Sequence, residues 1–152
     1  MAALADNAVV VYDPARNPIK RQWKTGAITD EFYRGALVTC AAGTGLAVVT
    51  SVDASEFVGV CDQRRSFTGT AGNVWVILDA IMWFATTYAA DANVANTGYA
   101  ACTAASDNPA DIIQLAAGTT GQIGTLVQPD VTGTSGWFDI GIGARSPRGT
   151  NA

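Results

Sequence analysis

The sequence of 152 residues contains no histidine. Histidine is the side chain used most often as a general base, and it is the commonest protein ligand for metals such as zinc. The chain also lacks a GxSxG elbow and a GxxxxGK loop, which present a nucleophilic serine and a phosphate cradle respectively. A catalytic site would therefore have to be built from carboxylates, hydroxyl groups and thiols alone.

Cysteine is scarce, and Cys40, Cys61 and Cys102 lie far apart without a CxxC pair. This spacing argues against a zinc cage or a redox motif. The odd count, and the lack of the basic start and apolar core of a secretion signal in residues 1–11, lead us to expect a reducing compartment and free, buried thiols. A Cys40–Cys61 disulfide is the alternative, because both residues lie on expected strands that could be neighbours.

Charged residues make up only 14% of the sequence, about half of the usual share. Such a surface consists largely of small, weakly polar residues, and it can pack against neighbouring molecules at little desolvation cost. No Lys or Arg occurs between residues 66 and 144. The charged residues of that block are Asp79, Asp91, Asp107, Asp111, Asp130 and Asp139. The net charge of -4 makes nucleic acid a poor partner.

The sequence also lacks an uninterrupted apolar run of about 20 residues, the length that a membrane-spanning helix needs. The run GNVWVILDAIMWFATTY, residues 72–88, is shorter and carries Asp79 near the middle of its apolar part. It shows no polar stripe of helical period and is rich in Val, Ile, Trp and Phe, which favours strands. We expect strands at Asn73–Leu78 and Ile81–Ala85 with a tight reversal or bulge at Asp79-Ala80, and a core helix is the alternative.

From residue 27 onward, short β-rich runs alternate with turn residues. Gly43-Thr44-Gly45 between two apolar runs indicates a hairpin. The alternation in GWFDIGIG predicts that Phe138, Ile140 and Ile142 point inward. ITDEFYRG, residues 28–35, is expected to form one helical turn. Eight or nine short strands in all predict an all-β fold, either a small β-sandwich or a β-barrel.

Residues 1–25 show neither a helical nor an alternating period, and Pro14 and Pro18 favour extended backbone before them. We expect an extended N-terminal arm over residues 1–25 and a single β-rich domain over residues 26–152. Removal of the arm should then leave the fold intact. Trp23 lies between Arg21 and Lys24, and it is interpreted either as an exposed anchor for a partner or as a side chain folded back onto the body.

Three pairs of carboxylates are the candidates for acid–base chemistry: Asp30 with Glu31, Asp53 with Glu56, and Asp107 with Asp111. Each pair lies in an expected turn, where Asp commonly caps the backbone, so a structural role is favoured. Calcium binding by Asp107, Asn108 and Asp111 is the alternative, although the spacing is not that of an EF-hand. We predict no catalytic residue, no metal site and no cofactor.

CDQRRSF contains the only adjacent basic pair of the body, Arg64 and Arg65. The pair is interpreted either as the solvated end of a loop or as a fork that docks a carboxylate of a partner. Asp62 is expected to pair with Arg64.

The stretch ALVTC…GLAVVTSVDASEFVGVCDQ places a short polar segment between a strand pair and an F-x-G-V strand, with Phe57, Gly59 and Val60 in the last motif. NVWVILDAIMWFA, AADANVANTGYAACTAASDN and QIGTLVQPDVTGTSGWFDIGI follow. Taken in this order, the stretches resemble the small capsid decoration, or cement, proteins of tailed bacteriophages. In that resemblance NVWVILDAIMWFA corresponds to a hairpin, and QIGTLVQPDVTGTSGWFDIGI corresponds to the closing pair of strands. The resemblance covers residues 26–144 and consists of strand order and glycine placement.

The resemblance implies a virion structural protein, made in the host cytoplasm and bound to the exterior of the capsid, with no enzymatic activity. It implies homotrimers at three-fold or quasi-three-fold positions that clamp the major capsid protein against the pressure of packaged DNA. Contact with nucleic acid or membrane is not implied. The capsid-contact candidates in this sequence are Arg16, Lys20, Arg21, Trp23, Lys24, Arg64 and Arg65.

Two other functions remain open at this point. A carbohydrate-binding β-module of a phage tail or fibre would use exposed Trp75, Trp83 or Trp137 to stack on sugars. A small enzyme would have to work with Asp and Glu alone.

Overall fold

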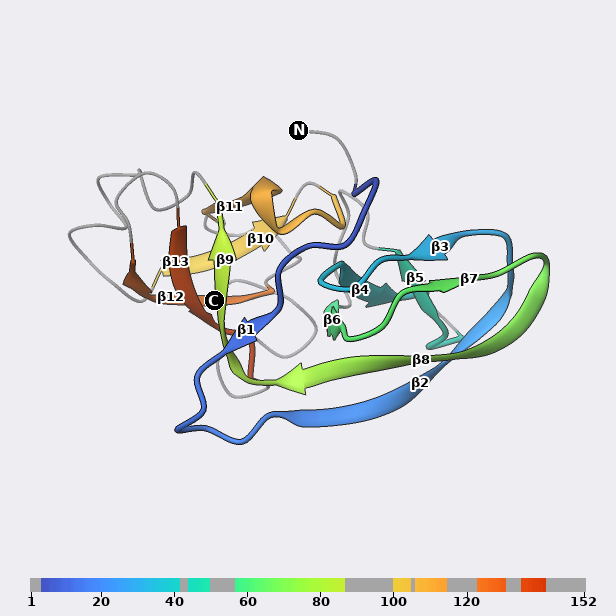
Figure 1. Ribbon diagram of the computed structural model, residues 1–152, viewed down its shortest axis with the longest axis horizontal. Coiled ribbons are helices and arrows are strands. Elements are labelled where there is room, and N and C mark those ends of the chain that lie inside the picture. Colours follow the sequence, from blue (N-terminus) through green and yellow to red (C-terminus); the bar gives the residue numbers. More distant parts are fainter. Residues whose placement is uncertain are drawn as a thin grey trace.

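The computed structural model describes residues 4–41, 44–49, 57–86, 100–104, 106–114, 123–130 and 135–141. These residues form a closed barrel and an open sheet that pack side by side (Figure 1). A further two-stranded sheet and the short 3-10 helix η2 (Pro109–Asp111) belong to the described part. The prediction of an all-β fold is confirmed, and a barrel is combined with an open sheet in one molecule.

The barrel closes in the strand order β2-β5-β4-β6-β8. Its longest strands, β2 and β8, have ten residues each and pair antiparallel as a curved ribbon along the lower edge of Figure 1. The strands β3 and β7 pair beside the barrel. The bounds are β2 Ile19–Ile28, β3 Glu31–Phe32, β4 Leu37–Cys40, β5 Ala47–Val49, β6 Phe57–Cys61, β7 Arg65–Ser66 and β8 Thr70–Asp79.

The open sheet has six strands in the order β1-β9-β13-β12-β10-β11, and every neighbouring pair is antiparallel. The predicted closing strand pair corresponds to β12 and β13, which are hydrogen-bonded neighbours. The bounds are β1 Val11–Tyr12, β9 Ile81–Ala85, β10 Ala100–Ala104, β11 Ile112–Gln114, β12 Gly124–Pro129 and β13 Ser135–Asp139.

The apolar run that the sequence analysis divided into two strands is divided at the expected place, between Asp79 and Ile81. The expectation of a reversal or hairpin there is wrong, because β8 pairs with β2 and β6 whereas β9 pairs with β1 and β13. Ala80 is fully buried, and its carbonyl accepts a hydrogen bond from Ile140 N at 3.0 Å. The chain therefore passes at Ala80 from the barrel into the open sheet.

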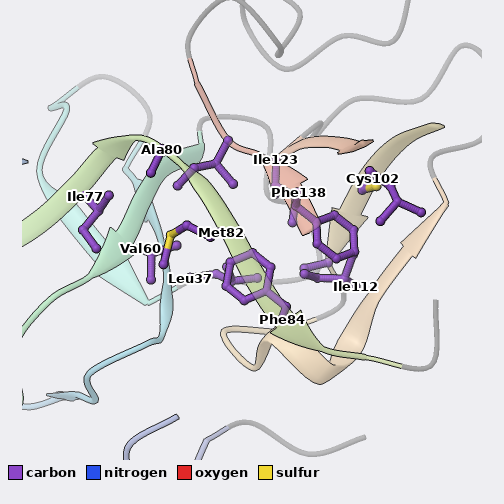
Figure 2. Packing of buried hydrophobic residues seen from close by; sticks show 13 residues of the cluster. Leu37, Val60, Ile77, Ala80, Met82, Phe84, Cys102, Ile112, Ile123 and Phe138 are labelled. Atoms are coloured by element: carbon purple, nitrogen blue, oxygen red, sulfur yellow. The ribbon is translucent and has the colours of Figure 1, made fainter. Parts of the chain in front are cut away.

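A single apolar cluster joins the barrel to the sheet (Figure 2). Leu37, Val60 and Ile77 come from the barrel strands, and they lie in one cluster with Met82 and Phe84 of β9. Each of these side chains has at most 2% of its surface exposed. One apolar cluster therefore serves both the barrel and the open sheet.

A second cluster fills the barrel itself. Phe32 and Phe67 meet there edge to face with ring centroids 5.8 Å apart, and Val74 and Val76 of β8 are fully buried beside them. Alternate residues of β8 thus point into this cluster, as expected for a strand with period two.

The division expected after residue 25 is not a structural boundary, because β2 runs through it from Ile19 to Ile28. β2 pairs with β8 from Ile19↔Asp79 to Ile28↔Thr70, and β1 pairs with β9. Residues 19–25 are extended as predicted, but they form a wall of the barrel. Removing residues 1–25 would remove most of that strand, so the expectation of an intact fold after truncation needs correction.

The predictions for local segments had mixed outcomes. The hairpin around Gly43-Thr44-Gly45 corresponds to the antiparallel pair β4–β5, with Gly45 at a φ of 68°. Phe138 and Ile140 are buried as predicted. The helical turn expected in residues 28–35 is wrong: Glu31–Phe32 is strand β3, because Phe32 is buried against the barrel and its backbone pairs with β7.

All three cysteines are free thiols, so the Cys40–Cys61 disulfide does not form. Cys61 and Cys102 are buried and Cys40 is half-buried. Burial raises the pKa of Cys61 to about 11, which keeps this thiol protonated at neutral pH. Ile142, Asp91 and the Asp53–Glu56 pair lie outside the described residues.

Gly59 of the F-x-G-V strand is required by the close approach of β6 to β8. A Cβ at this position would lie 2.0 Å from Ile77 O. The substitution Gly59→Ala should therefore lower the free energy of unfolding by roughly 2–3 kcal/mol or prevent folding. Gly26→Ala is the matched control, since its Cβ would meet only the flexible Leu46 side chain at 3.3 Å. Equal losses for both variants in urea unfolding would contradict this account.

Candidate functional site

Arg16 connects the barrel to the open sheet through ion pairs. Its Nη1 donates to Asp139 Oδ2 at 2.9 Å, and its Nη2 donates to Asp79 Oδ1. Asp79 ends β8 and Asp139 ends β13. Gly141 lies under this cluster, because a Cβ there would lie 2.3 Å from Arg16 Nη2. Arg16, a capsid-contact candidate, is thus engaged within its own chain.

Asp62 binds two cations of the N-terminal half. It accepts from Lys20 Nζ at 2.9 Å and from Arg34 Nη2 at 3.3 Å. The hydrogen bond to Asp62 is the main reason that the pKa of Lys20 is raised. The expected pairing of Asp62 with Arg64 is wrong, because Arg64 points toward different carboxylates.

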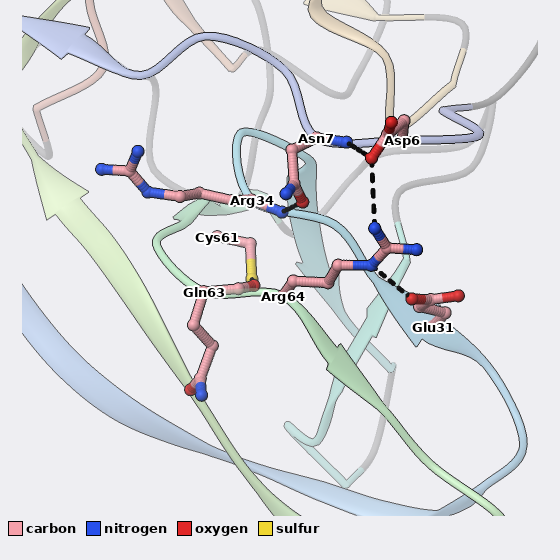
Figure 3. A network of polar contacts seen from close by, with 7 residues as sticks. All are labelled: Asp6, Asn7, Glu31, Arg34, Cys61, Gln63 and Arg64. Carbon is pink, nitrogen blue, oxygen red and sulfur yellow. Dashed lines mark hydrogen bonds and ion pairs between the residues drawn. The ribbon is translucent and has the colours of Figure 1, made fainter.

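Arg64 does act as a fork for carboxylates, but for those of its own chain (Figure 3). Its Nε donates to Glu31 Oε1 at 2.7 Å and its Nη1 donates to Asp6 Oδ1 at 3.1 Å. The hydrogen bond from Arg64 lowers the pKa of Glu31. Asn7 Oδ1 accepts from Arg34 N at 3.0 Å beside this fork. The network therefore holds residues 6 and 7 against the barrel.

Two further candidates also lie against the body. Arg65 lies over the ring of Phe67, with its guanidinium carbon 4.8 Å from the centroid, and donates to Asn73 O. Trp23 donates from Nε1 to Gly45 O at 2.8 Å and packs against the barrel cluster. Trp23 is therefore a side chain folded back onto the body and not an exposed anchor, which decides between the two interpretations given from the sequence.

Arg21 and Lys24 are the two cationic candidates that make neither an ion pair nor a cation–π contact within the described part of the chain. Arg21 donates only to the neighbouring carbonyl of Lys20 at 3.0 Å. Lys24 is exposed and makes no hydrogen bond or ion pair with another described residue. The exposed residues around them on β2 and β8 form what we call the ribbon surface: Ile19, Arg21, Gln22, Lys24 and Trp75.

The ribbon surface combines cationic, amide and apolar groups. Trp75 is 43% exposed and Ile19 is 44% exposed, which places both among the most exposed large apolar side chains of the described residues. Gln22 lies directly opposite Trp75 in the register of β2 and β8. The cations here were identified from the sequence, but Ile19 and Gln22 were not. Strand pairing was needed to place Gln22 opposite Trp75.

The carboxylates near η2 have structural partners. Asp107 is buried, and its Oδ1 accepts from Leu4 N at 3.0 Å. Asn108 Oδ1 caps η2 by accepting from Ala110 N at 3.0 Å, and Ser106 donates to Asp111. The oxygens considered for calcium therefore accept hydrogen bonds within the chain. Across the described ranges, no group of three His, Cys, Asp or Glu side chains is placed to hold a metal.

The outer face of the open sheet carries a second candidate surface. Trp83 of β9 lies opposite Trp137 of β13, and both are half-buried. Trp83 Nε1 donates to Asp130 Oδ2 at 2.7 Å. A shallow pocket of about 310 Å³ adjoins Trp137 and is lined by Asp13, Ile81, Val127, Gln128 and Trp137. The tryptophans were named from the sequence, but Asp13 and Gln128 were not, because only the pairing of the strands brings them to Trp137.

Most of the carboxylates described above already serve cations or backbone amides, and burial keeps the Cys61 thiol protonated. Within the described ranges, no helix is long and apolar enough to cross a membrane. Comparisons with protein-family models, curated proteins and solved structures give no match to this chain.

The Arg16 cluster generates a prediction about stability. Arg16→Ala leaves Asp79 and Asp139 close together without their shared cation, so the free energy of unfolding should fall by about 1–2 kcal/mol. Arg21→Ala removes a guanidinium without an ion pair and should change it by less than about 0.5 kcal/mol. Urea unfolding at low salt measures both. Similar losses for the two variants would count against a clamp at Arg16.

Asp107 generates a prediction about pH. Burial raises the pKa of Asp107, with the nearby Asp111 adding to the effect, while the hydrogen bond from Leu4 opposes it. The stability that this group contributes is present below the ordinary Asp pKa and is lost as the pH rises through the raised value. Asp107→Asn keeps an acceptor for Leu4, so its stability relative to the wild type should increase between about pH 3 and pH 7. Urea unfolding at both pH values measures the difference in the free energy of unfolding between the variant and the wild type. A difference that is the same at both pH values would contradict the prediction.

Proposed function

We propose that this protein is a virion structural protein that decorates the outer surface of a phage capsid and stabilises it. The observation that carries the proposal is the ribbon surface, where Gln22 lies directly opposite exposed Trp75 and Lys24 follows two residues along β2, with Arg21 and Ile19 exposed on the same strand. Protein interfaces favour this combination of an aromatic anchor, arginine and flanking polar groups. The major capsid protein is the proposed partner.

Contacts within the chain already engage several of the capsid-contact candidates. Arg16, Lys20, Arg64 and Arg65 have partners within the chain, and Trp23 is bonded to the β4–β5 turn. Using them for the capsid would first require breaking those contacts. Arg21 and Lys24 require no such loss, so the proposal places the docking contacts on them and on their exposed neighbours.

A rigid attachment is consistent with a clamping role. β2 and β8 are paired over nearly their whole length, so the ribbon surface is already ordered before binding. Preorganised contacts avoid the entropic cost of ordering side chains and backbone on association. Many copies on a lattice, in the proposed form of homotrimers, would add avidity to a modest affinity of each site.

The test is co-sedimentation with expanded heads from the particle whose genome encodes this chain. The double variant Lys24→Glu/Trp75→Ala reverses one charge and removes the aromatic anchor, so the apparent affinity should fall at least about tenfold. Gln128→Ala, on the open sheet, is the matched control and should bind as the wild type does. Thermal unfolding of each variant checks that the fold is retained.

The proposal fails if the wild-type protein does not bind expanded heads, or if the ribbon variant binds them as tightly as the wild type. Binding that is equally strong to unexpanded heads would also argue against a stabilising role on the mature shell. Analytical ultracentrifugation of the free protein tests the proposed trimer separately.

A further inference from the structure

We propose that the pocket beside Trp137 binds a neutral carbohydrate, with one pyranose ring lying against the indole of Trp137. This binding site goes beyond capsid decoration, and it lies on the open sheet rather than on the ribbon surface. Val11, Trp83, Trp137 and Gln128 stand opposite one another on four neighbouring strands.

The row lies on the outer face of the sheet because the flanking residues point inward. Met82 and Phe84 of β9, and Phe138 of β13, are buried in the shared core. Trp83 and Trp137 alternate with them and therefore face outward. Cross-strand neighbours on one face have Cβ atoms about 5 Å apart, so Trp83 and Trp137 are neighbours on the outer face of the sheet. Trp137 is the one of the two that lines the pocket.

Several polar groups that line the pocket can still form hydrogen bonds with a ligand. Trp137 Nε1 and the Gln128 side-chain amide make no hydrogen bond with another described residue. Asp13 Oδ1 accepts from Ala15 N at 2.9 Å, which leaves its second oxygen for a ligand. Trp83 provides the contrast, because its Nε1 is already bonded to Asp130. The pocket thus offers an indole donor, a carboxylate acceptor and an amide that can do both.

This set of groups selects a class of ligand. Ile81, Val127 and the indole of Trp137 provide apolar contact, whereas Asp13 and Gln128 require hydrogen-bonding groups. A pyranose has an apolar C–H face and hydroxyl groups around its rim, so it satisfies both. A purely apolar ligand would leave the polar groups desolvated without partners. An anionic sugar would meet the negative charge of Asp13 without a compensating cation among the residues that line the pocket.

The first experiment is an NMR titration that follows the four indole N–H signals of the full-length protein, assigned with Trp→Phe variants. The ligands are the methyl pyranosides of glucose, galactose, mannose and N-acetylglucosamine, with N-acetylneuraminic acid and choline as separate arms. At least one neutral pyranoside should shift the Trp137 signal in a saturable way, with a Kd in the range of about 1 mM that is usual for a single weak site. The Trp75 and Trp23 signals should stay unchanged.

The second experiment compares variants with the pyranoside that binds. Gln128→Ala should weaken binding about fivefold through the loss of one hydrogen bond, and Trp137→Ala roughly tenfold or more through the loss of ring contact. Gln128 is exposed, so its substitution should leave thermal unfolding unchanged. Trp75→Ala is the matched control and should bind the sugar as the wild type does.

The proposal is overturned if no neutral pyranoside shifts the Trp137 signal, or if only choline or N-acetylneuraminic acid does. It is also overturned if a sugar shifts Trp75 instead, or if Gln128→Ala and Trp137→Ala bind as tightly as the wild type. Head binding is measured on the ribbon variant and sugar binding on the pocket variants. Failure of one proposal therefore leaves the other standing.

Discussion

The apolar core shared by barrel and sheet is the constraint on which the other features depend. Ile77 ends the barrel side of this core and Met82 begins the sheet side, with only a few residues between them. The buried crossing at Ala80 therefore fixes how the two assemblies lie relative to each other. The ion pairs of Arg16 reinforce the same junction from outside, at the last residues of β8 and β13. The two proposed binding surfaces are separate because each belongs to one assembly.

Much of the secondary structure could be predicted from the sequence, because the spacing of apolar residues and the local composition favour strands and turns in each short segment. The strand Ile81–Ala85 was predicted with its observed bounds, and the β4–β5 hairpin follows from its glycine-rich turn. Pairing partners could not be predicted in the same way. Whether β8 turns back on β9 or crosses into another sheet depends on which strands bury the two ends. Within residues 28–35, Glu31–Phe32 form a strand because Phe32 is buried against Phe67 and the backbone pairs with β7.

For the candidate site too, individual residues could be identified from the sequence, whereas their contacts with residues far away in the chain could not. A run of basic residues before residue 25 suggested a free arm, but the sequence could not indicate that carboxylates far away would engage two of the four, Arg16 and Lys20. Asp62, Asp79 and Asp139 are those partners, and they leave Arg21 and Lys24 exposed. The pocket on the open sheet could not be predicted for the same reason, since Asp13 and Gln128 come together only through the pairing of four strands.

The pairing of β2 with β8 also has a consequence for biosynthesis. β2 ends at Ile28, and its partner is complete only at Asp79, so roughly fifty residues must leave the ribosome before the two strands can meet. During that interval β2 presents unpaired amides and carbonyls, and contacts between distant residues form slowly. The positive charges of Lys20, Arg21 and Lys24 repel other nascent copies, and charged edges of this kind limit wrong strand pairing between chains. Arg21 and Lys24, the cations of the proposed docking surface, thus also oppose wrong pairing between growing chains.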